Sequence, residues 1–134
     1  MAETKAKKSK ILIVDDDTSL VEVLEFVMGR EGFDVQSAVS GDQALAKVAA
    51  DPPDLIVLDL LIPRVSGLEV LRNLQSQGHG HIPVIIITGR YAGDPAYEEM
   101  IRLEPNVKDF LKKPVGYVYL SARIRQLLGT AGHA

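Results

Sequence analysis

The sequence contains no cysteine and no tryptophan, and only 5% of its residues are aromatic. The absence of cysteine excludes disulfide bonds and thiolate metal sites. The longest apolar runs, such as residues 55–58 and 84–87, are far too short to span a bilayer. The first residues also lack the apolar segment of a secretion signal. The net charge of −3 does not suit a nucleic-acid-binding domain, which usually carries a basic face. We therefore expect a cytoplasmic protein that binds neither membranes nor nucleic acid directly.

A chain of 134 residues is long enough for one domain with a buried core. Lysines cluster near its start, at Lys5, Lys7, Lys8 and Lys10. We expect residues 1–8 to form a disordered basic leader, residues 9–128 to form the domain, and residues 129–134 to form a short tail. The sequence leaves open whether the chain acts alone or is one domain of a longer protein.

Short apolar runs recur along the chain at residues 11–14, 55–58 and 84–87. Strands that are apolar on both faces belong in the centre of a parallel sheet covered on each side. Segments 33–38 and 107–111 are more polar and suit edge strands. Helical patterns separate these strands, and the serial βα order predicts an α/β, doubly wound parallel sheet of five strands with five helices.

Each predicted helix has its own markers in the sequence. The first has apolar residues at helical spacing and a glycine stop: Leu20, Val23, Leu24 and Val27, then Gly32. Two helices open with capping boxes, at Ser40-x-x-Gln43 and Ser66-x-x-Glu69. The next opens with the pair Asp94-Pro95, an N-cap followed by a proline at the first helical position. The last has an apolar stripe that ends before Gly129: Leu120, Ile124, Leu127 and Leu128.

Polar residues stand where the predicted strands end: Asp15 and Asp16, Asp59, Thr88, and Lys113. In doubly wound sheets, ligands bind at this carboxyl edge. Three clustered carboxylates repel one another, so protons or a cation must neutralise them. Mg²⁺ suits such an oxygen site and keeps waters for phosphate oxygens to replace. The set predicts a Mg²⁺ site for phosphoryl transfer to an aspartate, where Lys113 and Thr88 stabilise the phosphoryl charge.

The ordered set of motifs resembles the receiver domains of two-component response regulators over roughly residues 9–128. The matching segments are Ile11-Leu-Ile-Val-Asp-Asp16, Asp54-Leu-Ile-Val-Leu-Asp59 with Pro63 and Gly67 after it, Ile85-Ile-Ile-Thr88, and Lys113-Pro114. The resemblance implies a CheY-like, flavodoxin-like fold with strand order 2-1-3-4-5.

The resemblance also implies a role for each site residue. The donor would be a phosphohistidine on a sensor histidine kinase or a histidine phosphotransfer protein, and Mg²⁺ would be the cofactor. Phe110 would turn inward as Thr88 moves toward the phosphate, although its position also suits an ordinary core residue. The implied set comprises the phosphoacceptor Asp59; metal ligands Asp15, Asp16, Asp59 and the backbone carbonyl of Leu61; phosphate and switch residues Thr88, Lys113 and Phe110; and modulators Leu61, Gly89 and Arg90.

Phosphorylation would then shift an existing two-state equilibrium of the face formed by the fourth helix, the fifth strand and the fifth helix. Through this face the chain would contact a downstream protein target or an attached output domain, as a monomer or a weak dimer. Such a chain is a signalling switch that catalyses only its own phosphorylation and dephosphorylation.

Several features depart from the family pattern. Gly89 follows Thr88 where a small residue such as alanine is common, and Ser66 stands where an acid or asparagine is frequent. The stretch 88–113 is longer than usual and has residues 104–107 in place of a Gly-Ala pair, so we expect a displaced or irregular fourth helix and exit loop. Leu61 and Arg90 do not help to position a hydrolytic water, which predicts slow self-dephosphorylation.

Two other interpretations remain open from the residues. Asp15-x-Asp17-x-Ser19-Leu20 resembles the opening motif of haloacid-dehalogenase-type phosphatases, with Asp15 as the nucleophile. That interpretation lacks the later acidic motif, since no acidic residue follows Lys113, and it leaves Asp59 without a role. The second is a receiver-like binding module that is never phosphorylated, which predicts the loss of one of the site residues.

Overall fold

The computed structural model describes residues 8–89 and 95–129. Within these residues, strands and helices alternate along the chain. Their bounds are β1 Lys10–Val14, α1 Thr18–Arg30, β2 Asp34–Ala38, α2 Gly41–Ala50, β3 Leu55–Asp59, α3 Gly67–Ser76, β4 Val84–Thr88, α4 Pro95–Arg102, β5 Val107–Lys112 and α5 Tyr117–Leu128. The strands form one sheet in the order β2-β1-β3-β4-β5, and every neighbouring pair is parallel. The predicted fold class and strand order are confirmed.

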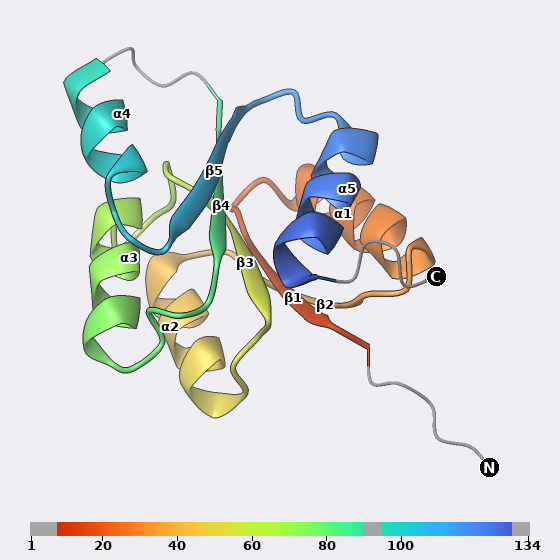
Figure 1. Ribbon diagram of the computed structural model, residues 1–134, viewed down its shortest axis with the longest axis horizontal. Helices are drawn as coiled ribbons and strands as arrows, with labels where there is room; N and C mark the ends of the chain where they lie inside the picture. The colour runs from red at the N-terminus through yellow and green to blue at the C-terminus, as the bar shows by residue number, and fades with distance from the viewer. Residues whose placement is uncertain (1–7, 90–94, 130–134) are drawn as a thin grey trace.

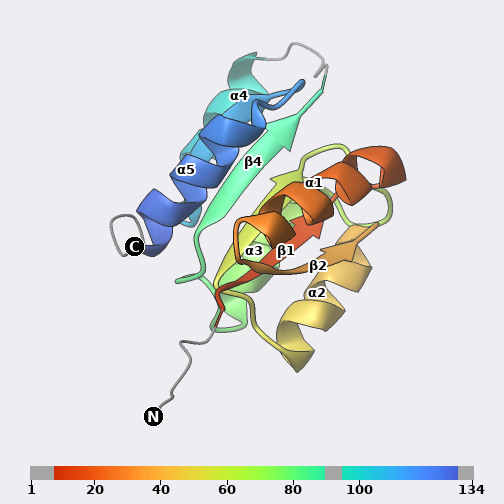
Figure 2. The same ribbon diagram turned by 90° about the vertical axis from the view of Figure 1, so that its right-hand side faces the viewer.

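The helices cover both faces of the sheet. α1 and α5 lie on one side, and α2, α3 and α4 lie on the other (Figure 1). Figure 2 looks onto the side formed by α1 and α5. The carboxyl ends of the strands lead to the upper side of Figure 1, where β5 connects to α5. This edge carries the polar residues singled out in the sequence.

The central strands are buried because each supplies side chains to two cores. Alternate residues of β1, such as Leu12 and Val14, pack under α2, α3 and α4. The intervening residues, Ile11 and Ile13, pack under α1 and α5. A strand in this setting needs an apolar residue at every position, whereas each of the edge strands β2 and β5 has one buried residue among half-buried and exposed ones. The assignment of central and edge strands is confirmed.

The predicted capping boxes differ in their outcome. Ser66 and Glu69 form the complete reciprocal box at the start of α3. Ser40 caps α2 by accepting a hydrogen bond from the backbone N–H of Gln43, at 3.3 Å. However, the side chain of Gln43 accepts from the backbone N–H of Val39, at 2.8 Å, and not from that of Ser40. The box at Ser40 therefore contains only one of its two predicted hydrogen bonds.

The buried face of α1 also differs from the prediction. Val21, Leu24 and Met28 are its buried residues, whereas Val23 is 40% exposed. Several periodic choices of apolar residues fit this helix, and the sheet selects only one of them. Gly32 and Gly129 both have positive φ after α1 and α5, as expected for glycine stops.

The fourth helix is regular where the structure describes it, from Pro95 to Arg102, so the expectation of irregularity is wrong for this part. Hydrogen bonds also order its exit loop. Buried Asn106 donates to the carbonyl of Leu71 (3.2 Å) and accepts from Gln75 (2.8 Å). The calls on Arg90, the Asp94 cap, residues 1–7 of the leader and residues 130–134 of the tail lie outside the described residues. None of the described helices could cross a membrane, by length and hydropathy.

Candidate functional site

Three carboxylates meet at the carboxyl edge of the sheet. Asp15 follows β1 directly, and Asp59 is the last residue of β3, its neighbour in the sheet. Asp15, Asp16 and Asp59 each place an oxygen within 4.8 Å of the others. Asp15 and Asp59 are buried, and Asp16 is exposed. The cluster is therefore fixed in the sheet and open to solvent on the Asp16 side.

Backbone N–H groups hold the two buried carboxylates in place. The N–H of Asp17 donates to Asp15 Oδ1 (2.9 Å), and the N–H of Leu61 donates to Asp59 Oδ1 (3.0 Å). In each case the donor lies two residues after the acid, in the turn that leaves the strand. The second oxygen of each carboxylate stays available to other partners in the site.

Lys113 supplies the positive charge between these acids. Its Nζ lies 2.8 Å from Asp15 Oδ2 and 3.1 Å from Asp59 Oδ2. Its backbone N–H donates to the carbonyl of Thr88 (2.8 Å), which fixes the chain where β5 ends beside β4. Burial lowers the pKa of the Lys113 ammonium, but hydrogen bonds to Asp15 and Asp59 outweigh burial and raise the pKa above its ordinary value. The side chain therefore stays protonated.

The electrostatics of the cluster favour an additional cation. Burial raises the pKa of Asp59 to about 6, and the Asp15 carboxylate adds to this effect, against the lowering effect of the Leu61 N–H and Lys113. Three carboxylates and one ammonium carry a net charge of −2 when all are ionised. Carboxylate oxygens are the donors that Mg²⁺ prefers, so the residues present fit this ion.

Thr88 ends β4 in the same layer and is fully buried. Its hydroxyl has no hydrogen-bond partner within residues 8–89 and 95–129. Buried hydroxyls rarely lack a partner, because desolvation without a hydrogen bond costs free energy. Beside it, a Cβ added at Gly89 would lie 3.8 Å from Lys113 Cδ, which is an ordinary van der Waals contact. Because Gly89 has no side chain, the Lys113 side chain lacks one van der Waals contact at this point.

The remaining predicted residues lie around this cluster. Leu61 has a side chain that is 53% exposed, although its backbone N–H binds Asp59. Phe110 lies three residues before Lys113 and is buried in the core under α3 and α4. The structure shows no contact between the Phe110 ring and the described acids, and it places the ring in the hydrophobic core.

Sequence reasoning missed two supporting features. It assigned Lys113 to the phosphoryl group on Asp59 and gave it no contact with Asp15, to which the nearer carboxylate oxygen belongs. It also gave no reason for Gly67, where a Cβ would lie 2.7 Å from the Leu60 side chain and 3.1 Å from its Cα. The first turn of α3 therefore packs closely against the residue after Asp59, and a side chain at position 67 would force the Leu60 side chain to shift.

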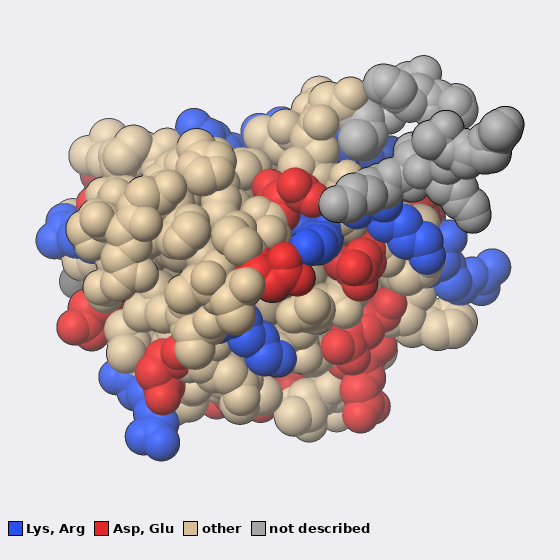
Figure 3. Space-filling model, turned by 90° about the horizontal axis from the view of Figure 1, so that it is seen from below, with Lys and Arg blue, Asp and Glu red and all other residues tan. Residues whose placement is uncertain are grey.

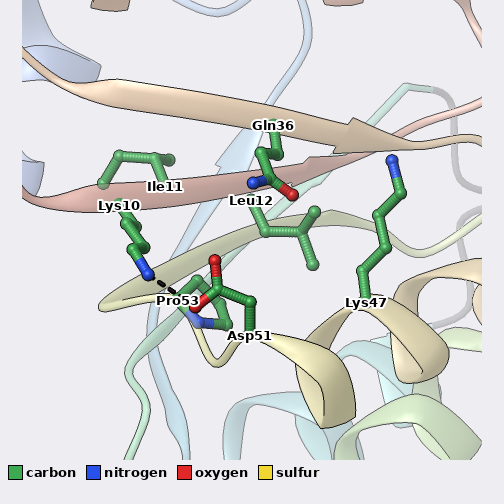
Figure 4. Close-up of a pocket in the computed structure, with 7 residues that line it drawn as sticks. All are labelled: Lys10, Ile11, Leu12, Gln36, Lys47, Asp51 and Pro53. Carbon is green, nitrogen blue, oxygen red and sulfur yellow. Dashed lines mark hydrogen bonds and ion pairs between the residues drawn. The ribbon is translucent and has the colours of Figure 1, made fainter.

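A separate small cavity lies between the start of β1 and α2 (Figure 4). Its volume is about 10 Å³, roughly the room for one water molecule. Lys10 and Asp51 form an ion pair at its mouth, and the Lys47 ammonium donates to the carbonyl of Ser37. Both lysines that line this cavity therefore have oxygen partners, and none of its lining residues belongs to the carboxylate cluster.

The chain matches the sequence profile of the response regulator receiver domain over residues 11–125. This range spans every residue of the cluster. The chain belongs to this family.

The receiver is similar to several curated regulators. It is 40% identical over 119 residues to the response regulator MprA of Mycolicibacterium vanbaalenii, covering 89% of this chain and 50% of that protein. It is 35% identical to the alkaline phosphatase synthesis transcriptional regulatory protein PhoP of Bacillus subtilis, covering 89% of this chain and 48% of that protein. The chain thus spans about half the length of these relatives.

Solved structures agree with the family assignment. A CheY-like receiver domain protein from Methanospirillum hungatei superposes with a TM-score of 0.83 at 25% identity, covering 92% of this chain and 95% of that one. The receiver domain of a signal transduction histidine kinase from Syntrophus aciditrophicus gives a TM-score of 0.80 at 30% identity, with 94% of each chain covered. Receiver domains thus occur in both kinases and regulators among the structures this chain resembles.

Proposed function

We propose that this receiver accepts a phosphoryl group on Asp59 from a phosphohistidine donor and changes its contacts with protein partners in response. The donor would be a sensor histidine kinase or a histidine phosphotransfer protein. The observation that carries the proposal is the position of the Lys113 ammonium between Asp15 and Asp59. That arrangement places a fixed positive charge where a phosphoryl group on Asp59 would develop negative charge.

Asp59 is the carboxylate best suited to act as the acceptor. Its Oδ1 is occupied by the N–H of Leu61, and its Oδ2 faces Lys113. With a pKa near 6, its side chain is mainly ionised at neutral pH. The nucleophilic oxygen forms the new bond to phosphorus as the phosphorus–nitrogen bond of the donor breaks, and the electron pair of that bond stays with the imidazole. Lys113 can then pair with the phosphoryl oxygens.

Asp15, Asp16, Asp59 and the backbone carbonyl of Leu61 would hold Mg²⁺. When bound, Mg²⁺ would neutralise the carboxylates and the phosphoryl oxygens. Asp15 is fixed by the N–H of Asp17, and exposed Asp16 gives access from solvent. The chain itself supplies an oxygen-only donor set with a surplus of negative charge, which is the chemistry this ion requires.

Thr88 would report the phosphorylation. Its buried hydroxyl, which lacks a partner in the described structure, can donate to a phosphoryl oxygen. That new hydrogen bond would favour one of two states of the α4-β5-α5 face, through which a downstream protein, an attached output domain or a second copy would bind. The effect requires only a few kcal/mol of preference between the states, on the order of the coupling energies typical of allostery.

On one face of the molecule, Lys and Arg are interspersed with Asp and Glu (Figure 3). This mixture agrees with the net charge of −3 and differs from the continuous basic surface of nucleic-acid-binding domains. The proposed partners are accordingly proteins, and the chain itself would not bind nucleic acid. We also infer that it acts as a cytoplasmic switch and not as a turnover enzyme.

The proposal is tested by incubating the protein with acetyl phosphate and Mg²⁺ and then measuring the intact mass. The expected result is a gain of one phosphoryl group that is lost in Asp59→Ala and in the presence of EDTA. Absence of the gain under conditions where Mg²⁺ binds would favour an unphosphorylated binding module. Sustained hydrolysis of a phosphate monoester that survives Asp59→Asn would instead favour the phosphatase interpretation.

A further inference from the structure

Every phenylalanine in the chain lies beside an arginine. Attraction between a cation and an aromatic ring extends to about 6 Å from the ring centroid and grows as the two approach. The distances from guanidinium carbon to ring centroid are 5.7 Å for Arg30 and Phe26, 5.3 Å for Arg125 and Phe33, and 4.4 Å for Arg102 and Phe110. The closest pair involves the Phe110 ring on β5, the strand that leads to Lys113.

Phe110 occupies a boundary position. It pairs with Ile86 of β4 in the sheet register, and its ring packs in the core under α3 and α4 with 7% of its surface exposed. Because β5 is an edge strand, solvent is available beside the ring. Arg102 is exposed, and its guanidinium covers this ring. The ring is thus held between apolar side chains and one cation.

Arg102 is held close to β5 by a second contact from the same helix. Glu98, one turn earlier on α4, pairs with Lys112 of β5 at 3.4 Å. Ile101 is the only fully buried residue among those described in α4. Partly buried Tyr97 of α4 also packs against this core, and the polar contacts with β5 add to these apolar contacts in placing the helix.

The residues after α4 fix the same end of the helix from the other side. Glu104 accepts hydrogen bonds from Gln75 (2.9 Å) and Arg72 (3.2 Å) of α3. Gln75 also donates to buried Asn106, at 2.8 Å. Arg102 therefore projects from an anchored helix end, which lowers the entropy cost of holding its guanidinium over the ring.

We propose that Arg102 is a positioning residue: its guanidinium stabilises the buried orientation of the Phe110 ring before phosphorylation and so keeps the receiver ready to respond. The inference rests on the proposed function, because the response is phosphorylation of Asp59. At the strength usual for such pairs near a protein surface, loss of the cation would lower the population ratio of buried to exposed ring by about two- to fivefold. Phosphorylation that requires the buried ring would slow in step with the loss of buried population.

The test uses the full chain with 4-fluorophenylalanine at its three phenylalanines and ¹⁹F NMR. Single Phe→Leu variants assign the three resonances. The solvent isotope shift of each resonance between H₂O and D₂O reports the exposure of that ring. Arg102→Gln removes the cation, Arg102→Lys retains it, and Arg30→Gln is the matched control because it removes the cation beside Phe26.

In Arg102→Gln, the Phe110 resonance is expected to gain solvent isotope shift, while those of Phe26 and Phe33 stay unchanged. Arg102→Lys should restore part of the wild-type value, and Arg30→Gln should move only the Phe26 resonance. Phosphorylation by acetyl phosphate, followed by intact mass, should slow in Arg102→Gln in proportion to the buried population lost, by at most about two- to fivefold. Beryllofluoride with Mg²⁺, which mimics an acyl phosphate, should return the Phe110 ring of this variant to its buried value.

An unchanged Phe110 resonance in Arg102→Gln would overturn the inference, because the core alone would then hold the ring. An exposed ring with an unchanged phosphorylation rate would also overturn it, since Arg102 would hold the ring without effect on the response. Failure of the wild type to accept a phosphoryl group is a different result. It would reject the proposed function, whereas the NMR comparison would still report whether Arg102 holds the ring.

Discussion

The ammonium of Lys113 lies 3.1 Å from Asp59 Oδ2, although the two residues are 54 positions apart in the chain. Asp59 closes the central strand β3, and Lys113 follows the edge strand β5, with β4 between them. The lysine side chain crosses the end of the intervening strand to reach the acid. A phosphoryl group on Asp59 would therefore meet a cation that the fold has already placed.

Neutralising Asp59 should stabilise the metal-free protein at neutral pH. The pKa of Asp59 rises from 3.8 to about 6 on folding, so the folded state binds more protons than the unfolded state between these values. Wild-type stability therefore falls as pH rises through this window, and the cost is complete above about pH 6. Asp59→Asn should increase the free energy of unfolding by roughly 1 to 3 kcal/mol at pH 7, with little change at pH 4.

This difference can be measured by urea unfolding in EDTA at both pH values. Added Mg²⁺ should reduce it by neutralising the wild-type carboxylates. Equal stability of the two proteins at pH 7 without metal would contradict the destabilising burial of this carboxylate.

Asp16 and Asp17 should differ in their contribution to Mg²⁺ binding. Asp16 belongs to the carboxylate cluster, whereas the Asp17 side chain caps α1 by accepting from the N–H of Leu20. Asparagine caps helices as well as aspartate, so Asp17→Asn removes a nearby charge and preserves the fold. Isothermal titration should show a loss of Mg²⁺ affinity of about tenfold or more in Asp16→Asn and a smaller loss in Asp17→Asn. Equal losses of Mg²⁺ affinity in the two variants would indicate that overall charge, and not ligation by Asp16, determines Mg²⁺ binding.

Thr88→Val should separate the hydroxyl from the packing of its side chain. The hydroxyl lacks a partner in the described structure, so replacing it with a methyl group should leave stability unchanged or increase it by up to about 1 kcal/mol. Thr88→Ser keeps the hydroxyl but removes a buried methyl group, and should cost about 1 kcal/mol. Thermal unfolding should show that Thr88→Val is at least as stable as the wild type and that Thr88→Ser is less stable.

The two Thr88 variants should also differ after phosphorylation. The changes that beryllofluoride and Mg²⁺ cause in the ¹⁹F NMR spectrum of the labelled protein should persist in Thr88→Ser and largely vanish in Thr88→Val. A full response in the valine variant would exclude the hydroxyl as the group that detects the phosphate.

The aspartyl phosphate should be long-lived on the isolated protein. The exposed side chain of Leu61 is apolar and offers no hydrogen bond to an attacking water. Removal of the phosphodonor followed by timed intact mass measurements gives the lifetime. Leu61→Asn, which introduces a polar group at this exposed position, should shorten it, and decay of the wild type within seconds would disprove the expectation.

The sequence predicted which acids and which lysine would meet at the carboxyl edge of the sheet, because these residues stand at strand ends. A continuous apolar run followed by Asp59 or Thr88 identifies a central strand and its carboxyl edge without knowledge of the rest of the chain. Local patterns were less informative for α1, where Val23 fits a helical stripe but lies in solvent. The half-formed box at Ser40 shows the same limit, because Gln43 had two neighbouring N–H groups within reach.

The sequence by itself determined the order of strands and helices along the chain and the central position of the apolar strands. It also determined which acids, hydroxyl and lysine meet at one edge of the sheet. These follow from periodicity and from the parallel direction of every strand. Only the tertiary structure decided that Lys113 lies nearer to Asp15 than to Asp59, that the Thr88 hydroxyl is left without a partner in the described residues, and that Arg102 covers Phe110. Such contacts join residues on different elements, and their distances depend on how the helices and strands pack, which no local pattern encodes.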